Sequence, residues 1–382
     1  MPQPIRKHIK DTYVPPEETI YTLLIDGNNL FKIAITGDKR INSRNEHIGG
    51  IYQFFLQIKI MLQKKDFDHV YVMWDEDNSG RLRYDIYPEY KANRDKNYGD
   101  YNEGINNFIK KTLLHSKNKI KSKPKDPKDE ENFIRERLAI KEYLEELFIR
   151  QISVDKVEGD DLIAYYCLNK KDNEKIVIMS GDKDLSQLIS DTIIIWDLNK
   201  KKFITKENHI NELGYHYENI LLKKIFCGDA SDNIKGVKGL GETLFFKYFP
   251  KVIKEKVDID YIINEAKTIN ENRILDKKKP IKVLDNIVNR ITDGCQGDKL
   301  YEINEKIINL KMPLMTEESI EEMKRIIDAP IDPENRSLGN LYKYIIRDDI
   351  TELKDDNQFV NLFNTFNKLI DKEKKYFYKN MT

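Results

Sequence analysis

Three short apolar segments of this chain each run into an aspartate. They are residues 23–25 before Asp26, residues 70–74 before Asp75, and residues 176–179 before Ser180, Gly181 and Asp182. Segments this short and this apolar are typical of strands buried on both faces of a parallel sheet. In such sheets ligands bind beyond the carboxyl ends of the strands. If the three strands are neighbours, their aspartates meet in one crevice.

Further carboxylates accompany these three. The additional acidic residues are Glu158, Asp160, Asp161, Asp184, Asp229 and Asp232. Two like charges about 5 Å apart repel by roughly 3 kcal/mol at an effective dielectric near 20, so a gathered set needs cations. Hard oxygen ligands select Mg²⁺ or Mn²⁺. One aspartate alone is more simply explained as a helix cap or turn residue, but the whole set favours a metal site.

Composition indicates a globular protein without a membrane segment. The 382 residues, 34% charged and 40% hydrophobic, suffice for two domains or one large one. The net charge is zero, yet residues 110–128 are strongly basic, so a polyanionic partner is not excluded. Cys167, Cys227 and Cys295 show no metal-binding spacing, and residues 1–18 have no signal-peptide core. We therefore expect a cytoplasmic protein with no membrane partner.

The order of apolar patterns predicts an α/β fold followed by helices. After a lead at residues 1–19, residues 20–210 alternate strand and helix, with helices expected at 50–64, 133–148, 162–168 and 185–189 and a strand at 193–196. A polar insertion at about 81–132 interrupts this pattern, and we expect its Lys- and Pro-rich centre to be mobile. Further helices are expected at 217–226, 244–249, 259–269, 281–291, 303–310 and 320–327.

Six motifs occur in the order typical of one known family. They are Leu24-Ile25-Asp26-Gly27-Asn28, Trp74-Asp75, Pro88-Glu89-Tyr90-Lys91-Ala92-Asn93-Arg94, Glu158-Gly159-Asp160-Asp161, Ser180-Gly181-Asp182-Lys183-Asp184 and Gly228-Asp229-Ala230-Ser231-Asp232-Asn233. Each motif alone is weak, but together, over about residues 21–249, they resemble the 5′-nuclease superfamily of flap endonucleases and 5′–3′ exonucleases, in particular its bacteriophage members. A phage-encoded protein would act in the host cytoplasm.

The resemblance implies a particular architecture. The expected fold is α/β, with a PIN-like, mostly parallel sheet flanked by helices at residues 20–210 and a helical arch inserted at about 81–132. A helical DNA-binding region would follow at 211–310, with a helix–three-turn–helix element at about 217–249. Residues 311–382 would form a helical C-terminal region of unknown role.

The resemblance also implies a two-metal phosphodiesterase. Asp26, Asp75, Glu158 and Asp160 would hold the first Mg²⁺, with Asp161 binding directly or through water. The second ion would be held by Asp182, Asp184, Asp229 and Asp232, and Mn²⁺ would substitute for Mg²⁺. Two ions about 3.5–4 Å apart activate water and stabilise the leaving oxygen, so no histidine base is needed, and these motifs contain none.

By the same resemblance, Lys91 and Arg94 hold the scissile phosphate and Tyr90 stacks on a terminal base. Cations are needed there because the carboxylates alone would repel the substrate. A solvated charged loop is the plainer alternative for this motif. The lysines of residues 110–128 would form an arch above a single strand of DNA.

A glycine-rich turn follows the last acidic motif. By resemblance, Gly236, Lys238, Gly239 and Gly241 would face a duplex phosphate and could seat K⁺. The sequence departs from the family pattern at residues 242–244, Glu-Thr-Leu, where a run containing lysine is commoner. Lys238 or Lys247 would then have to supply the missing charge.

We therefore expect a monomeric nuclease acting on DNA with 5′ flaps, nicks or single-stranded 5′ ends, or on RNA–DNA hybrids, in primer removal during replication or repair. Residues 311–382 would contact a replication protein.

A PIN-type ribonuclease would lack the arch lysines and the glycine turn. A haloacid-dehalogenase-type phosphatase needs a second aspartate where Asn28 stands. A catalytically silent DNA-binding protein would have lost acidic positions. The sequence does not decide between RNA primers and DNA flaps.

Overall fold

A six-stranded sheet forms the centre of the fold. The computed structural model describes residues 18–76, 78–93 and 127–381. The strand order is β3-β2-β1-β4-β5-β6, and each neighbouring pair is parallel except β5 and β6. The strands are β1 (Ile20–Asp26), β2 (His69–Met73), β3 (Arg150–Ile152), β4 (Glu174–Ser180), β5 (Ile193–Asp197) and β6 (Lys202–Ile204). The predicted mostly parallel α/β sheet is confirmed.

The central strand is apolar because both of its faces are covered. Leu23 and Ile25 belong to one apolar cluster and Leu24 to another, since successive side chains of a strand point to opposite faces. All three side chains are fully buried. The continuous apolar runs in the sequence therefore follow directly from burial between two helical layers.

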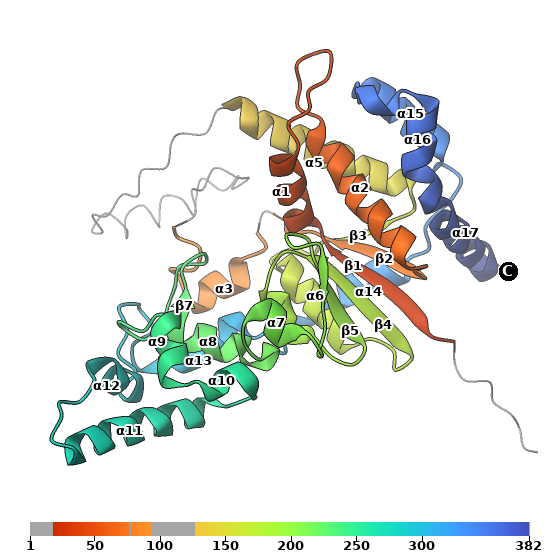
Figure 1. Cartoon of the computed structure of the whole chain (residues 1–382). Helices are drawn as coiled ribbons and strands as arrows, with labels where there is room; N and C mark the ends of the chain where they lie inside the picture. Colours follow the sequence, from red (N-terminus) through yellow and green to blue (C-terminus); the bar gives the residue numbers. More distant parts are fainter. Residues whose placement is uncertain (1–17, 77, 94–126, 382) are drawn as a thin grey trace, which may run out of the picture.

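Helices cover both faces of this sheet (Figure 1). Helices α1 (Gly27–Gly37), α2 (Gly49–Lys64) and α5 (Pro127–Glu146) lie on one face, and α6 (Gly159–Leu168) and α14 (Glu317–Asp328) lie on the other. The helices predicted at 50–64, 133–148 and 162–168 are confirmed. Residues 185–189 were expected as a helix, and the structure forms a short 3₁₀ turn there, η1 (Asp184–Leu188).

A second group of helices lies beside the carboxyl ends of the strands. It contains α3 (Arg81–Ile86), α7 (His209–Leu213), η2 (Tyr217–Asn219), α8 (Ile220–Cys227), β7 (Gly228–Asp229), β8 (Ile234–Lys235), α9 (Glu242–Tyr248), α10 (Lys251–Lys254), α11 (Ile259–Leu275), α12 (Lys282–Val288), η3 (Gly297–Lys299) and α13 (Leu300–Ile308). Helices α8 to α13 share a core of their own, which includes Phe226, Phe245 and Leu284. In Figure 1, α11 and α12 project from this group as an arm.

The C-terminal helices pack onto the sheet domain. Helices α15 (Leu338–Arg347), α16 (Asp356–Phe363) and α17 (Asn367–Met381), with the short turns η4 (Thr351–Leu353) and η5 (Asn364–Phe366), lie near α2 and α5 in Figure 1. Their residues Leu341, Phe363 and Phe366 belong to the same apolar cluster as Leu23. This region is helical as predicted, but its packing against the sheet domain was not foreseen. No helix of the described ranges could cross a bilayer.

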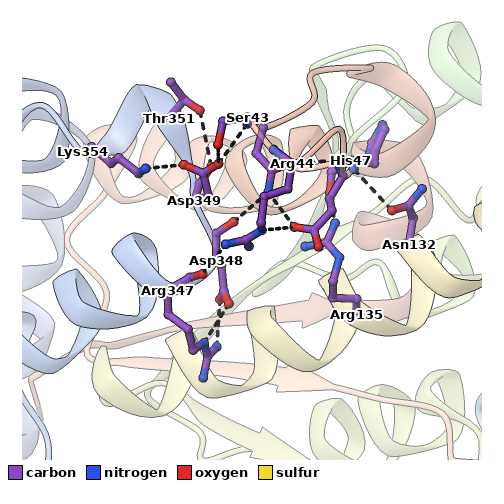
Figure 2. Close-up of polar contacts among 12 residues, drawn as sticks. Ser43, Arg44, His47, Asn132, Arg135, Arg347, Asp348, Asp349, Thr351 and Lys354 are labelled. Atoms are coloured by element: carbon purple, nitrogen blue, oxygen red, sulfur yellow. Dashed lines mark hydrogen bonds and ion pairs between the residues drawn. The ribbon is translucent and has the colours of Figure 1, made fainter.

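Polar contacts fix the hairpin between α1 and α2 against this C-terminal region (Figure 2). The Ser43 amide donates to Asp349 Oδ2 over 2.9 Å, and Lys354 pairs with the same carboxylate. Arg44 Nη1 donates to the Arg347 carbonyl over 3.1 Å. Segments about 300 residues apart in the chain are therefore joined at one edge of the domain.

Candidate active site

Three predicted ligands lie beyond the ends of adjacent parallel strands. Asp26 ends β1, Asp75 follows β2, and Asp182 follows β4, and β1 lies between the other two. Asp26 Oδ1 accepts a hydrogen bond of 3.0 Å from the Asn29 amide, and thereby caps α1. Ser180 Oγ donates to Asp26 Oδ2 over 2.7 Å, so β4 positions the same carboxylate. The prediction that these three strands are parallel neighbours is confirmed.

Asp75 is positioned by the neighbouring motifs. Asn28 Nδ2 donates to Asp75 Oδ2 over 2.7 Å, and the Gly159 amide donates to Asp75 Oδ1 over 2.5 Å. Asn28 lies in α1 and Gly159 is the first residue of α6. Two motifs that are far apart in the sequence therefore orient one carboxylate.

A pocket gathers the other acidic motifs. Its lining includes Glu158, Asp160, Asp184, Asp229 and Asp232, together with Arg83 and Tyr90. These carboxylates come from α6 and the residue before it, from η1 and from the β7–β8 segment, so the pocket lies between the sheet and the helical group. The structure thus brings the Glu158, Ser180 and Gly228 motifs to one place.

Mutual repulsion is visible in the electrostatics of the site. Burial, and then the charges of Asp75 and Asp182, raise the pKa of Asp26 to about 7. Burial and the charges of Asp182 and Asp26 hold the pKa of Asp160 well above its ordinary value. Burial also raises the pKa of Asp184 to about 6, although Lys224 opposes this. Carboxylates this crowded are stabilised by added positive charge.

Protein cations already neutralise part of the cluster. Lys91 Nζ lies 2.5 Å from Glu158 Oε1, and Lys224 Nζ lies 2.6 Å from Asp229 Oδ2 and also contacts Asp184. Although burial acts in the opposite direction, Lys91 and Arg83 lower the pKa of Glu158 to about 2. Against the same effect of burial, Lys224 lowers the pKa of Asp229 to about 2. These lysines hold their carboxylates ionised.

Arg83 is a site residue that sequence analysis missed. It is 5% exposed, and its guanidinium contacts both carboxylate oxygens of Asp161 and lies 2.8 Å from Glu158 Oε2. Its Nε also donates to the Ile307 carbonyl over 2.8 Å. No motif surrounds Arg83, so only the fold reveals it. Lys224 was missed for the same reason.

Asp161 differs from the other predicted ligands. Its carboxylate is 1% exposed, is held by Arg83, and accepts a hydrogen bond of 3.0 Å from the Leu314 amide. The pocket lining includes neither Asp161 nor Asp26, Asp75 and Asp182. The structure places Asp161 near Glu158, because Arg83 contacts both carboxylates, but the hydrogen bonds of Asp161 give it a structural setting.

The predicted phosphate-binding motif is only partly described. The Tyr90 ring is 2% exposed and its hydroxyl donates to Glu158 Oε2 over 2.9 Å. This position does not suit the expected stacking on a base, which needs an open ring face. Lys91 lies in the site, whereas Arg94 and most of the predicted arch, residues 94–126, lie outside the described residues.

The donor chemistry of the pocket fits a hard divalent cation, but its geometry is not that of a formed metal site. Mg²⁺ and Mn²⁺ prefer oxygen ligands, and a bound cation would relieve the repulsion between the carboxylates. Yet within residues 18–76, 78–93 and 127–381, no group of three or more His, Cys, Asp or Glu side chains is arranged to hold a metal ion. The predicted ligand set thus stays a prediction.

The structure explains two of the three glycines in the glycine turn. A Cβ on Gly236 would lie 2.3 Å from the Cys227 carbonyl carbon, so packing excludes a side chain there. Gly239 has a φ of +82°, which favours glycine, and Gly241 has open space around it. The Lys238 amide donates to the Ile291 carbonyl over 2.8 Å and is therefore not available to a phosphate.

Comparisons with known proteins agree with this architecture. Residues 21–214 match the family described as 5′–3′ exonuclease, N-terminal resolvase-like domain. A 5′–3′ exonuclease of Mycoplasmopsis pulmonis is 29% identical over 221 residues, which cover 58% of this chain and 63% of the relative. DNA polymerase I of Bacillus subtilis is 25% identical over 266 residues, covering 68% of this chain but 26% of that protein. The chain thus spans less than two thirds of either relative.

Solved structures show the same fold. The T5 5′-exonuclease with bound zinc ions superposes with a TM-score of 0.55 at 17% identity, covering 86% of this chain and 98% of that one. The T5 D15 flap endonuclease, in a complex with DNA and metal ions, gives a TM-score of 0.53 at 16% identity, covering 87% of this chain and 100% of that one. At these identities the likeness concerns the fold.

Proposed function

Because the chain belongs to the 5′–3′ exonuclease family defined by the N-terminal resolvase-like domain, we propose that it is a metal-dependent 5′ nuclease. Its substrates are DNA with 5′ flaps, nicks or single-stranded 5′ ends, or RNA–DNA hybrids. The observation that carries this proposal is the meeting of Asp26, Asp75 and Asp182 beyond three adjacent parallel strands, beside a pocket lined by further carboxylates. The zinc-bound and DNA-bound T5 structures support it by analogy.

Two Mg²⁺ ions, or Mn²⁺ in their place, would be held by the carboxylates of the crevice. Asp161 would act indirectly, by holding Arg83 at the pocket. The proposed ligands are Asp26, Asp75, Glu158, Asp160, Asp182, Asp184, Asp229 and Asp232. Bound metal supplies an activated water and stabilises the leaving oxygen.

The chain's own residues orient these carboxylates and add positive charge. Ser180 and Asn28 hold Asp26 and Asp75 by hydrogen bonds of 2.7 Å each. Lys91 supplies a cation at the pocket, where charge develops on the phosphate during cleavage. We propose that Arg94 adds a second cation. Lys224 keeps Asp184 and Asp229 together, and thereby joins the helical group to the sheet.

The biological setting we propose is primer removal in replication or repair. The similarity to part of a DNA polymerase I supports this setting. The proposal includes a monomer acting in the cytoplasm, which is the host cytoplasm for a phage-encoded protein. A replication-protein contact through residues 311–382 is part of it as well, as is K⁺ at the glycine turn.

The proposed activity is tested with 5′-labelled flap, nicked and RNA–DNA substrates, each with Mg²⁺ and with EDTA. We expect release of short 5′ products in Mg²⁺ and none in EDTA. Binding of flap DNA without cleavage in either Mg²⁺ or Mn²⁺ would identify the silent DNA-binding alternative. Cleavage restricted to single-stranded RNA would identify a PIN-type ribonuclease.

The glycine turn gives a prediction about duplex binding. Gly241→Ala should fold normally, because its backbone φ of −106° suits alanine and nothing lies within 4 Å of the new Cβ. The added methyl should keep a phosphate from approaching the backbone and cost about 1.5 kcal/mol, roughly tenfold in duplex affinity. The measurement is binding of flap DNA in Ca²⁺, beside cleavage of a short single strand in Mg²⁺.

Gly239→Ala should weaken duplex binding in the same way. It needs a control, because alanine at a φ of +82° also strains the backbone. Gly214→Ala provides it, since Gly214 has a φ of +90°, open surroundings and a place at the end of α7. If cleavage of flap DNA and cleavage of the short single strand fall equally while duplex affinity is unchanged, the turn is only a connector between helices.

A further inference from the structure

The arm formed by α11 and α12 ends in an exposed, basic loop. Residues 274–280 are all exposed, and they include Lys277, Lys278 and Lys279 in a row. Lys282, the first residue of α12, is exposed as well. Leu275 is 79% exposed beside these lysines. We call residues 276–282 the basic loop.

Buried contacts hold the basic loop in one conformation. Asn270 is 6% exposed, and its side chain both donates to the Ile281 carbonyl over 3.1 Å and accepts from the Ile281 amide over 2.8 Å. Asn270 Nδ2 also donates to Asp285 Oδ1 over 2.7 Å. Arg273 Nε donates to the Lys279 carbonyl over 3.0 Å. The lysines are therefore presented on a fixed backbone, which lowers the entropy cost of binding.

The end of α11 uses a lysine where glycine is usual. The Lys278 amide donates to the Arg273 carbonyl over 2.7 Å, and the Lys277 amide donates to the Ile274 carbonyl over 2.9 Å. These two bonds define a Schellman helix end, whose left-handed position is usually occupied by glycine. Lys277 takes that position with a φ of +59°. A strained residue held by its surroundings is a reason to look for a function.

Helix α12 links the basic loop to the glycine turn. Asn286 Nδ2, within α12, donates to the Lys238 carbonyl over 2.9 Å, and the Lys238 amide bonds to Ile291 just beyond α12. The 7 residues of α12 span about 10 Å at 1.5 Å per residue. The basic loop and the glycine turn are therefore joined through one short helix.

We propose that the basic loop binds the phosphate backbone of the duplex part of the substrate, in addition to the phosphates that the glycine turn would reach. This inference rests on the proposed function, which supplies DNA as the partner. Four lysines against one aspartate make the loop complementary to phosphate. Leu275 is compatible with the same partner, since minor-groove proteins combine basic side chains with apolar ones that insert between base steps.

The test compares two triple variants of the full chain. In the loop variant, Lys277, Lys279 and Lys282 are each replaced by glutamine. In the matched control, Lys171, Lys175 and Lys375 are replaced in the same way. These control lysines are exposed, and Lys175 lies in the second position of β4, at the amino end of the sheet, opposite the carboxylate crevice. Both variants lose the same charge.

Affinity for flap DNA is measured in Ca²⁺ by fluorescence anisotropy, with duplex arms of increasing length and at several salt concentrations. The loop variant should bind a long duplex about tenfold more weakly, with a salt slope reduced by about 0.9 for each phosphate that the loop no longer neutralises. Wild type and control should gain affinity once the duplex arm is long enough to reach the basic loop, whereas the loop variant should show no such gain.

The outcomes separate this inference from the proposed function. The loop variant should still cleave single-stranded 5′ ends in Mg²⁺ at the wild-type rate. Wild-type affinity and salt slope in the loop variant would overturn the inference, as would an equal loss of affinity in the control. Such a result would leave the loop free for a protein partner. Absence of cleavage by wild type on every substrate would overturn the proposed function instead, whatever the duplex-length series shows.

Discussion

Asp182→Asn should abolish cleavage of a 5′-labelled flap in Mg²⁺, lowering turnover by at least about 10³-fold. Metal ions contribute several kcal/mol of charge stabilisation, and about 4 kcal/mol corresponds to that factor. Asp182 lies close enough to Asp26 and Asp160 for its charge to raise the pKa of each. Its Oδ1 accepts a hydrogen bond of 2.9 Å from the Asp184 amide, which asparagine can keep. The variant thus removes charge and retains the turn.

The same variant should be as stable as wild type, or more stable, when both are melted in EDTA. Without metal, removal of one carboxylate relieves repulsion of up to about 3 kcal/mol. Asp191→Asn is the matched control, because Asp191 is 84% exposed, pairs with Lys206, and lies just before β5 at the amino end of the sheet. A loss of several degrees in melting temperature for Asp182→Asn in EDTA would make Asp182 a structural residue.

The core of the fold could be predicted because its signal is local. Residues 23–25, 70–74 and 176–179 are apolar throughout, and the pairing of β1 with β2 and β4 confirms that they are parallel neighbours. The position of each aspartate after its strand then follows from geometry. The order of the acidic motifs also predicted the family, and the match of residues 21–214 to that family confirms it.

Other elements could not be predicted because tertiary contacts decide them. Helix α1 begins Gly27-Asn28-Asn29, residues with poor helix propensity, and it is stabilised by the Asp26 cap and by burial of Leu30 and Phe31. The place of α17 depends on contacts such as Lys372 Nζ with Asp68 Oδ1, at 2.8 Å. No local pattern encodes a pairing across that much sequence.

The site shows the same limit at the level of single side chains. The order of the motifs identified Tyr90, Lys91 and Glu158. It could not predict that Tyr90 is buried with its hydroxyl bonded to Glu158. Arg83 lies in a plain helical segment, and its partner Asp161 is remote in sequence. A buried ion pair of this kind becomes visible only when the elements that carry it are packed.

Lys91→Ala should lower turnover by about 10²–10³-fold, the scale expected when one donor to a developing charge is removed. Lys91 is fixed at the pocket: its amide donates to the Asp232 carbonyl over 2.7 Å and its Nζ lies 2.5 Å from Glu158. Flap affinity in Ca²⁺ should change far less, because many phosphate contacts share binding. Lys206→Ala, a surface lysine paired with Asp191, is the control for the removed charge. Equal reductions in affinity and turnover would make Lys91 an ordinary backbone contact.

The dependence of turnover on Mg²⁺ separates two roles for Lys91. If Lys91 acts on the phosphate, its removal leaves Glu158 more available to a cation, so half-saturation should occur at the same or a lower Mg²⁺ concentration while the maximal rate stays low. If Lys91 merely orients Glu158, the variant should need more Mg²⁺, and a high concentration should restore its rate. Lys91→Arg keeps the charge and should retain more activity than Lys91→Ala in the first case. A full recovery at high Mg²⁺ would therefore assign Lys91 to positioning Glu158 and remove it from the reaction itself.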